Sequence, residues 1–212
     1  MWEWNEERQL FVNDETGETL ALSEMEDFID DVIADSMDEA DDLIDQYLDP
    51  EIDERNPRSR LWWLLFSEQL RDLYFLLIGL GIGSSLLIIG GLLDEVNRLL
   101  NRQFTYLDSM AGEVLAGTLS LGSIKRRIHM YVNSSRSSYW VGRDEFERRK
   151  GSREEHWITL GDTHVCTPCN EAEDLGWQLI GTFAQPGSGV VVIVPTTLCA
   201  GLTSCRCRKL YR

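Results

Sequence analysis

Five cysteines, the residues of this chain with the most distinctive chemistry, all lie in its last quarter. They are Cys166, Cys169, Cys199, Cys205 and Cys207, and the first two enclose Thr-Pro. A tight turn across two intervening residues can present both sulfurs to one ion, and zinc prefers a tetrahedron of thiolate and imidazole ligands. The spacing therefore predicts a structural zinc site near the C-terminus.

The exact ligand set stays open, because the five cysteines outnumber the four ligands of one tetrahedral site and His164 is a further candidate. We expect both cysteines of the Cys-x-x-Cys pair to bind, with two of the last three. So many thiolates favour a closed structural site over a catalytic one, which keeps a position for water. The alternatives are a reduced cluster without metal, or one disulfide beside the remaining thiols. A redox role for the pair fits less well, since no βαβ pattern surrounds it.

No other group of residues indicates catalysis. The three histidines, His129, His156 and His164, are dispersed, and neither a Ser/His/Asp set nor a phosphate-binding glycine loop is present. Zinc deaminase chemistry would need His-x-Glu and Pro-Cys-x-x-Cys, and the proline here lies inside the cysteine pair. The sequence predicts a protein that is not an enzyme.

The elements that position these residues differ sharply in charge. Residues 1–54 hold 21 Asp and Glu against one Arg, whereas residues 55–212 hold 19 Lys and Arg against 15 Asp and Glu. The net charge of −16 therefore belongs to an N-terminal arm. We predict three parts: an acidic arm at 1–56, a helical domain at 57–155 and a Cys-rich, zinc-binding β module at 156–212.

The arm is predicted to contain a weak hairpin at 9–22, turning at Asn13–Gly17, and then a long amphipathic helix. Ser23–Glu26 forms a capping box, apolar residues recur every three or four positions to residue 48, and Pro50 ends the helix. Its other face is almost wholly acidic. We interpret that face as solvated, with a docking surface for a basic partner protein as the alternative. A calcium loop at Asp35–Asp38 lacks the required glycine and ligand spacing.

The stretch 75–93 is free of charge for 19 residues, five of them glycine. As one helix it would be about 28 Å long, which is enough to cross a bilayer. Each glycine weakens a helix by about 1 kcal/mol relative to alanine. We therefore predict two buried helical pieces joined by a glycine turn after a helix at 61–74, with a membrane anchor as the alternative.

A basic region follows these pieces. We expect further helical segments at 94–107 and 106–119, arranged as helical hairpins, and then a long helix capped by Ser120 with nine basic residues against three acidic ones up to Arg153. Aromatic residues at 131, 139, 140 and 146 interrupt the basic ones, so the helix could follow packaged DNA. The alternative is that it pairs with the acidic arm of its own or a neighbouring chain.

The expected fold is mainly α, with helical hairpins, an acidic N-terminal helix and a small zinc-clipped β module. In that module, 176–181 and 190–194 are β-prone and bracket a turn at 185–189. Such a small unit would depend on metal binding to stay folded.

Several motifs resemble those of the minor head, or head-morphogenesis, proteins of tailed bacteriophages, a family related to the Mu F-like group. The resemblance covers about residues 60–212. It rests on Phe104–Leu107, Glu113–Ser120, Arg126–Tyr131, the Cys-x-x-Cys pair and the closing Cys205-Arg206-Cys207. The chain departs from the family in its long acidic arm and in having Cys199 where a histidine is usual.

The resemblance implies a structural virion protein, assembled in the host cytoplasm and present in few copies. Its implied partners are portal or capsid proteins of the same particle, and its implied role is in head assembly, portal-vertex organisation or genome delivery. It implies an oligomer in the particle and no catalysis. The alternative functions are a zinc-containing nucleic-acid-binding protein and a small protein anchored in a membrane by residues 75–93.

Overall fold

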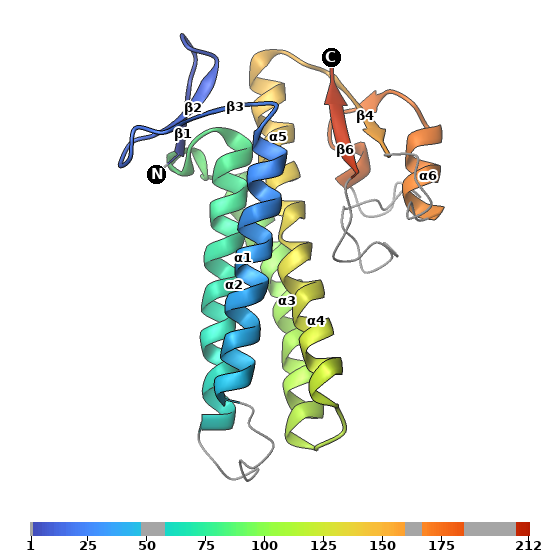
Figure 1. Cartoon of the computed structure of the whole chain (residues 1–212). Coiled ribbons are helices and arrows are strands. Elements are labelled where there is room, and N and C mark those ends of the chain that lie inside the picture. The colour runs from blue at the N-terminus through green and yellow to red at the C-terminus, as the bar shows by residue number, and fades with distance from the viewer. Residues whose placement is uncertain (1, 48–57, 160–166, 185–206) are drawn as a thin grey trace.

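The structure, a computed structural model, describes residues 2–47, 58–159, 167–184 and 207–212. It confirms the prediction of a mainly helical protein, with two small antiparallel sheets. Figure 1 shows an elongated bundle in which α4 and α5 follow one another along one line. The long helices are α1 (Met25–Tyr47), α2 (Arg58–Ile82), α3 (Gly91–Leu115), α4 (Leu121–Ser134) and α5 (Arg136–Lys150).

The predicted N-terminal hairpin is confirmed and gains a third strand. Strands β1 (Trp2–Asn5), β2 (Leu10–Asn13) and β3 (Thr19–Ala21) form an antiparallel sheet in that order. The Asn13 carbonyl accepts a hydrogen bond from the backbone N–H of Gly17, which has a positive φ of 72°. The sheet lies at the end of the bundle where α1 begins (Figure 1).

Helix α1 buries the predicted apolar stripe, which includes Met25, Ile29, Ile33 and Ile44. It begins at Met25, two residues after the predicted cap. The hydrogen bond formed there runs from the backbone N–H of Ala21 to the Glu24 carboxylate. Since α1 is continuous through residues 35–38, that segment is not a calcium loop.

The acidic face of α1 is partly paired with the basic helices of the same chain. Lys125 Nζ lies 2.8 Å from Asp45 Oδ1, and His129 Nε2 lies 2.9 Å from Asp41 Oδ1. Arg136 also contacts Asp30. These contacts confirm, for this chain, the alternative in which the basic region pairs with the acidic arm.

The uncharged stretch at 75–93 is divided by a glycine turn, as predicted. The rest of the prediction is wrong: the helix expected at 61–74 and the first piece form one continuous helix, α2, and the 3-10 helix after the turn buries none of its residues. Helix α2 runs to Ile82, Gly83 has a φ of 91°, and the 3-10 helix η1 (Ser85–Leu87) precedes α3. Within the described residues, no helix is both long enough and apolar enough to span a membrane.

Helices α2 and α5 approach each other backbone to backbone at a pair of glycines. A Cβ atom on Gly81 would lie 2.2 Å from the Tyr139 carbonyl oxygen, and one on Gly142 would lie 2.3 Å from that of Ile78. Real Cβ atoms do not approach other atoms so closely. The glycines that weaken α2 as an isolated helix are therefore what lets it pack in the bundle.

Two helix boundaries differ from the predictions. The segments expected at 94–107 and 106–119 are one helix, α3. The long basic helix is interrupted at Ser135, between α4 and α5, and ends at Lys150 instead of continuing to Arg153. The cap at Ser120 is confirmed, because its side chain accepts a hydrogen bond from the backbone N–H of Ser123.

The C-terminal part forms a three-stranded antiparallel sheet in the order β5-β4-β6. Its elements are β4 (Glu154–Ile158), α6 (Thr167–Asp174), β5 (Gln178–Leu179), η2 (Thr182–Ala184) and β6 (Arg208–Tyr211). The strand predicted within 176–181 is present as β5, whereas 190–194 lie outside the described residues. One contiguous core includes Phe11, Leu77, Trp157 and Cys207, from each of the three predicted parts.

Candidate functional site

The predicted metal ligands are only partly within the described residues. Cys169 on α6 and Cys207 immediately before β6 are both buried and belong to the common core. The other candidates, His164, Cys166, Cys199 and Cys205, lie outside the described residues. Within the residues described, no group of three or more His, Cys, Asp or Glu is placed to hold a metal ion.

The sheet register places the two described thiols at the same end of the module. Ile158 pairs with Arg208, so Cys207 follows the antiparallel register toward Thr159. Thr159 donates a hydrogen bond of 2.5 Å to the Glu173 carboxylate, and Glu173 lies one helical turn after Cys169 on α6. Two buried cysteines from separate elements thus belong to one core, and thiolate is a ligand that zinc prefers.

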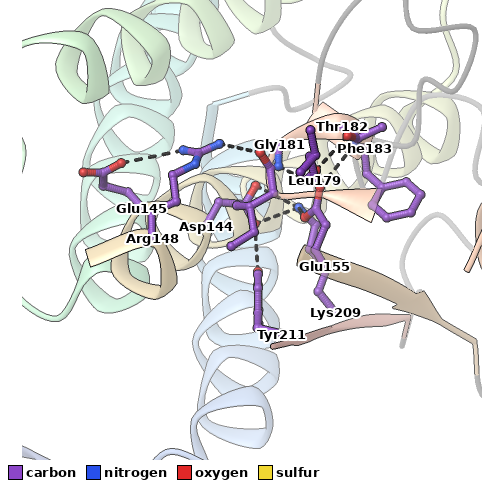
Figure 2. Close-up of polar contacts among 11 residues, drawn as sticks. Asp144, Glu145, Arg148, Glu155, Leu179, Gly181, Thr182, Phe183, Lys209 and Tyr211 are labelled. Atoms are coloured by element: carbon purple, nitrogen blue, oxygen red, sulfur yellow. Dashed lines mark hydrogen bonds and ion pairs between the residues drawn. The ribbon is translucent and has the colours of Figure 1, made fainter. Parts of the chain in front are cut away.

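A second site, which the sequence analysis did not predict, lies where the sheet meets α5. Strand alternation turns Glu155 and Trp157 of β4 and Lys209 and Tyr211 of β6 to one face, and Glu155 pairs with Tyr211 in the register. Asp144 of α5 meets them there. We call Asp144, Glu155, Lys209 and Tyr211 the junction cluster (Figure 2).

Lys209 is at the centre of the junction cluster. Its Nζ donates to both oxygens of Asp144 at 2.9 Å and lies 2.6 Å from Glu155 Oε2. The Tyr211 hydroxyl donates to Asp144 Oδ1 at 2.8 Å. The side chains of Lys209, Asp144 and Glu155 are 3%, 4% and 0% exposed, so water reaches none of them appreciably.

Burial and mutual attraction set the ionisation of the junction cluster. Burial raises the pKa of Glu155, against the opposing effect of Lys209. Burial lowers the pKa of Lys209, but Asp144 and Glu155 outweigh this effect and the pKa is raised overall. Burial and the Asp144 charge raise the pKa of Tyr211 well above its usual value. Lys209 therefore stays a cation, suited to binding carboxylates and unsuited to acting as a base or nucleophile.

Backbone contacts extend the junction cluster to the β5–η2 segment. Glu155 Oε1 accepts hydrogen bonds from the backbone N–H groups of Gly181, at 2.8 Å, and Phe183, at 3.2 Å. From α5, Arg148 donates to the Ile180 carbonyl at 2.8 Å. One helix and three segments of the module are thereby connected through charged hydrogen bonds, which are among the strongest in proteins.

A groove of about 450 Å³ adjoins the junction cluster between α3 and α5. The cations that line it are already paired: Arg98 with Glu95, and Arg148 and Arg149 with Glu145. Arg148 and Arg149 share the single carboxylate of Glu145, so the groove keeps one positive charge in excess of the carboxylates that pair with its arginines.

The aromatic residues proposed for DNA contact lie inside the protein, whereas Arg126, Arg148, Arg149, Lys150 and Arg153 are exposed. The aromatic residues that interrupt the basic helix, Tyr131, Tyr139, Trp140 and Phe146, are each no more than 8% exposed. Arg136 and Arg143 are buried as well, and Arg143 lies 2.5 Å from the Glu147 carboxylate. These side chains stabilise the bundle and present no stacking surface to nucleic-acid bases.

Sequence reasoning missed the junction cluster because Lys209 and Tyr211 lie 65 and 67 residues after Asp144. The available signal was local: Lys209 and Tyr211 alternate in a short strand, and Asp144 is one of the few acidic residues of a basic helix. Comparison of the chain with protein-family models, with curated proteins and with solved structures gives no match.

Proposed function

We propose that this protein is a structural component of a tailed-phage head, of the minor head type that its sequence resembles. In this proposal the helical bundle is the main domain of the protein, and the C-terminal module is the part that binds portal or capsid proteins. The observation that carries the proposal is the junction cluster, which fixes the module to α5 through buried ions. Such an attachment holds the module in a fixed orientation relative to the bundle, which suits a protein that links other proteins in an assembly.

In this proposal a bound zinc ion also stabilises the module. Cys169 and Cys207 supply two thiolates from separate elements, and the remaining ligands come from Cys166, Cys199, Cys205 and His164. The module is small, so the free energy of metal binding would contribute directly to its folding. We assign the ion no catalytic role.

The proposal predicts incorporation into particles. Purified particles of the phage that encodes the chain are expected to contain it in few copies, when quantified by mass spectrometry against the major capsid protein. Truncation after Lys150 is expected to abolish incorporation while the bundle remains helical by circular dichroism. Particles that contain none of the full-length chain would contradict the proposed role.

Removing a zinc ligand is expected to unfold the module while leaving the bundle folded. Protein purified under reducing conditions should contain one zinc ion per chain, and Cys169→Ala should lose it because thiolate is the ligand. Amide hydrogen exchange should then accelerate by about a hundredfold or more in β4 and β6 and stay unchanged in α2.

Ala172→Ser provides a control for packing. Ala172 is also fully buried on α6, so its replacement disturbs the same helix without touching a thiol. This variant is expected to keep its zinc. Wild-type protein without zinc would show that the metal proposal is wrong, even if the protein still enters particles.

A further inference from the structure

A hollow of about 380 Å³ opens between α1 and α2. These two helices lie on the side of the bundle away from the C-terminal module (Figure 1). The volume of the hollow falls within the usual range of ligand pockets. Its apolar lining consists of Phe66, Leu70, Leu73, Leu76 and Val132. Leu76 is 43% exposed, so part of this apolar surface is in contact with water.

The rim of the hollow is acidic. Glu39 of α1 and Asp72 of α2 line it, and no basic residue of the described part of the chain lines it with them. The Asp72 side chain is 79% exposed and pairs with Arg71 Nε at 3.7 Å, and the Arg71 side chain is itself 52% exposed. Such an exposed pair contributes little, so the rim keeps most of its negative charge.

The surroundings add to this charge. Asp35, Asp38 and Asp42 are exposed on α1, and Glu68 is exposed one turn before Asp72 on α2. None of these four carboxylates forms an ion pair with a residue that the structure describes. They differ in this from Asp41 and Asp45, which the basic helix neutralises.

A polar group that lines the hollow has no partner among the residues that the structure describes. Gln69 lines the hollow, and its Oε1 is buried without a hydrogen-bond donor among the described residues. A buried acceptor left without a donor costs free energy, which a ligand N–H group would recover. The hollow thus combines an apolar floor, a buried acceptor and an anionic rim.

We propose that this hollow is the docking site for a basic amphipathic helix of a partner protein. Leucine-like side chains of that helix enter between α1 and α2, and its lysine or arginine side chains meet Glu39 and Asp72. Placing an apolar helix face in a groove is a common mode of peptide recognition, and charge complementarity selects the partner. This site goes beyond the proposed function of the C-terminal module, because it lies away from the module and needs neither zinc nor a phage particle.

A synthetic peptide tests the proposal directly. The probe is a labelled helical peptide with leucines at positions i, i+3, i+4 and i+7 and lysines elsewhere, and its control has glutamate in place of each lysine. Fluorescence anisotropy with the full-length chain is expected to detect the lysine peptide and not the glutamate peptide. No binding of the lysine peptide at about 1 mM, equivalent to about 4 kcal/mol, would overturn the proposal.

Charge reversal then locates the site. The rim variant is Glu39→Lys with Asp72→Lys, and its matched control is Asp27→Lys with Asp31→Lys, which changes the net charge equally on an exposed part of α1 outside the hollow. The rim variant is expected to weaken binding about tenfold, and the control less than about twofold. Equal weakening by both would show non-specific attraction to an acidic protein and overturn the site.

The apolar floor needs its own test. Leu76→Gln is expected to weaken binding of the lysine peptide in 0.5 M salt. The screening length is then about 4 Å, so charge attraction is weak and the apolar contribution to binding is dominant. An unchanged affinity would contradict insertion into the hollow. If sedimentation shows instead that the chain self-associates and that Leu76→Gln restores the monomer, the occupant is a second copy and the partner proposal is wrong.

Discussion

Gly81→Ala and Gly142→Ala are each expected to destabilise the fold by about 3 kcal/mol, the upper range for overpacking a core. A methyl group at residue 81 would lie 2.2 Å from the Tyr139 carbonyl oxygen and 2.8 Å from the Arg143 backbone nitrogen. These neighbours are backbone atoms of a helix, so no side-chain rotation relieves the contact. Only separation of α2 from α5 does, at the most extensive helix contact of the bundle.

The loss is measurable by urea unfolding followed by circular dichroism. Both methyl groups act on the same crossing, so the double variant is expected to cost less than the sum of the two single variants. The matched control is Gly112→Ala on α3, where an added Cβ meets nothing within 4 Å. Because alanine favours helix by about 1 kcal/mol over glycine, this control should be neutral or stabilising. Wild-type stability of both crossing variants would contradict the close approach.

The glycines show how far sequence reasoning reaches in the helical part. Periodicity identified the apolar stripe of α1, and the glycine content of residues 75–93 correctly predicted a turn but not the burial of the piece after it. The turn lies at Gly83, whereas Gly81 stays helical and faces Gly142, more than 50 residues away. A helix propensity scale treats Gly81 as a defect because it contains no information about the facing helix.

The charged residues show the same limit. The opposite charges of the arm and of the basic helix were evident, and their pairing in one chain was among the alternatives. Which charges are buried was not evident, because Arg208 and Lys209 are neighbours in the same short strand and only alternation places one outside and the other inside. The predicted zinc site depends on local spacing alone and therefore stays a prediction for the cysteines outside the described residues.

Lys209→Met is expected to destabilise the C-terminal module by about 3–5 kcal/mol, the usual cost of removing one partner from a buried ion pair. Methionine preserves much of the side-chain volume but leaves Asp144 and Glu155 facing each other without a cation. Amide exchange in β4 and β6 is expected to accelerate far more than exchange in α2. The matched control is Arg212→Met, directly after the same strand, whose partner Glu154 is exposed, and it should cost less than about 1 kcal/mol.

The pH dependence of the Lys209→Met variant distinguishes lost charge from lost packing. Burial already raises the pKa of Glu155 with the lysine in place, and removing the cation raises it further. A carboxyl group whose pKa is higher in the folded than in the unfolded state binds protons preferentially when folded, so its penalty diminishes as the pH falls. The stability difference from wild type is therefore expected to shrink between about pH 7 and pH 5.

The double variant Lys209→Met with Asp144→Leu should recover part of the loss at pH 7, because it removes one of the two uncompensated charges. A deficit that is independent of pH and enlarged by Asp144→Leu would show that packing, and not charge, holds the module to α5.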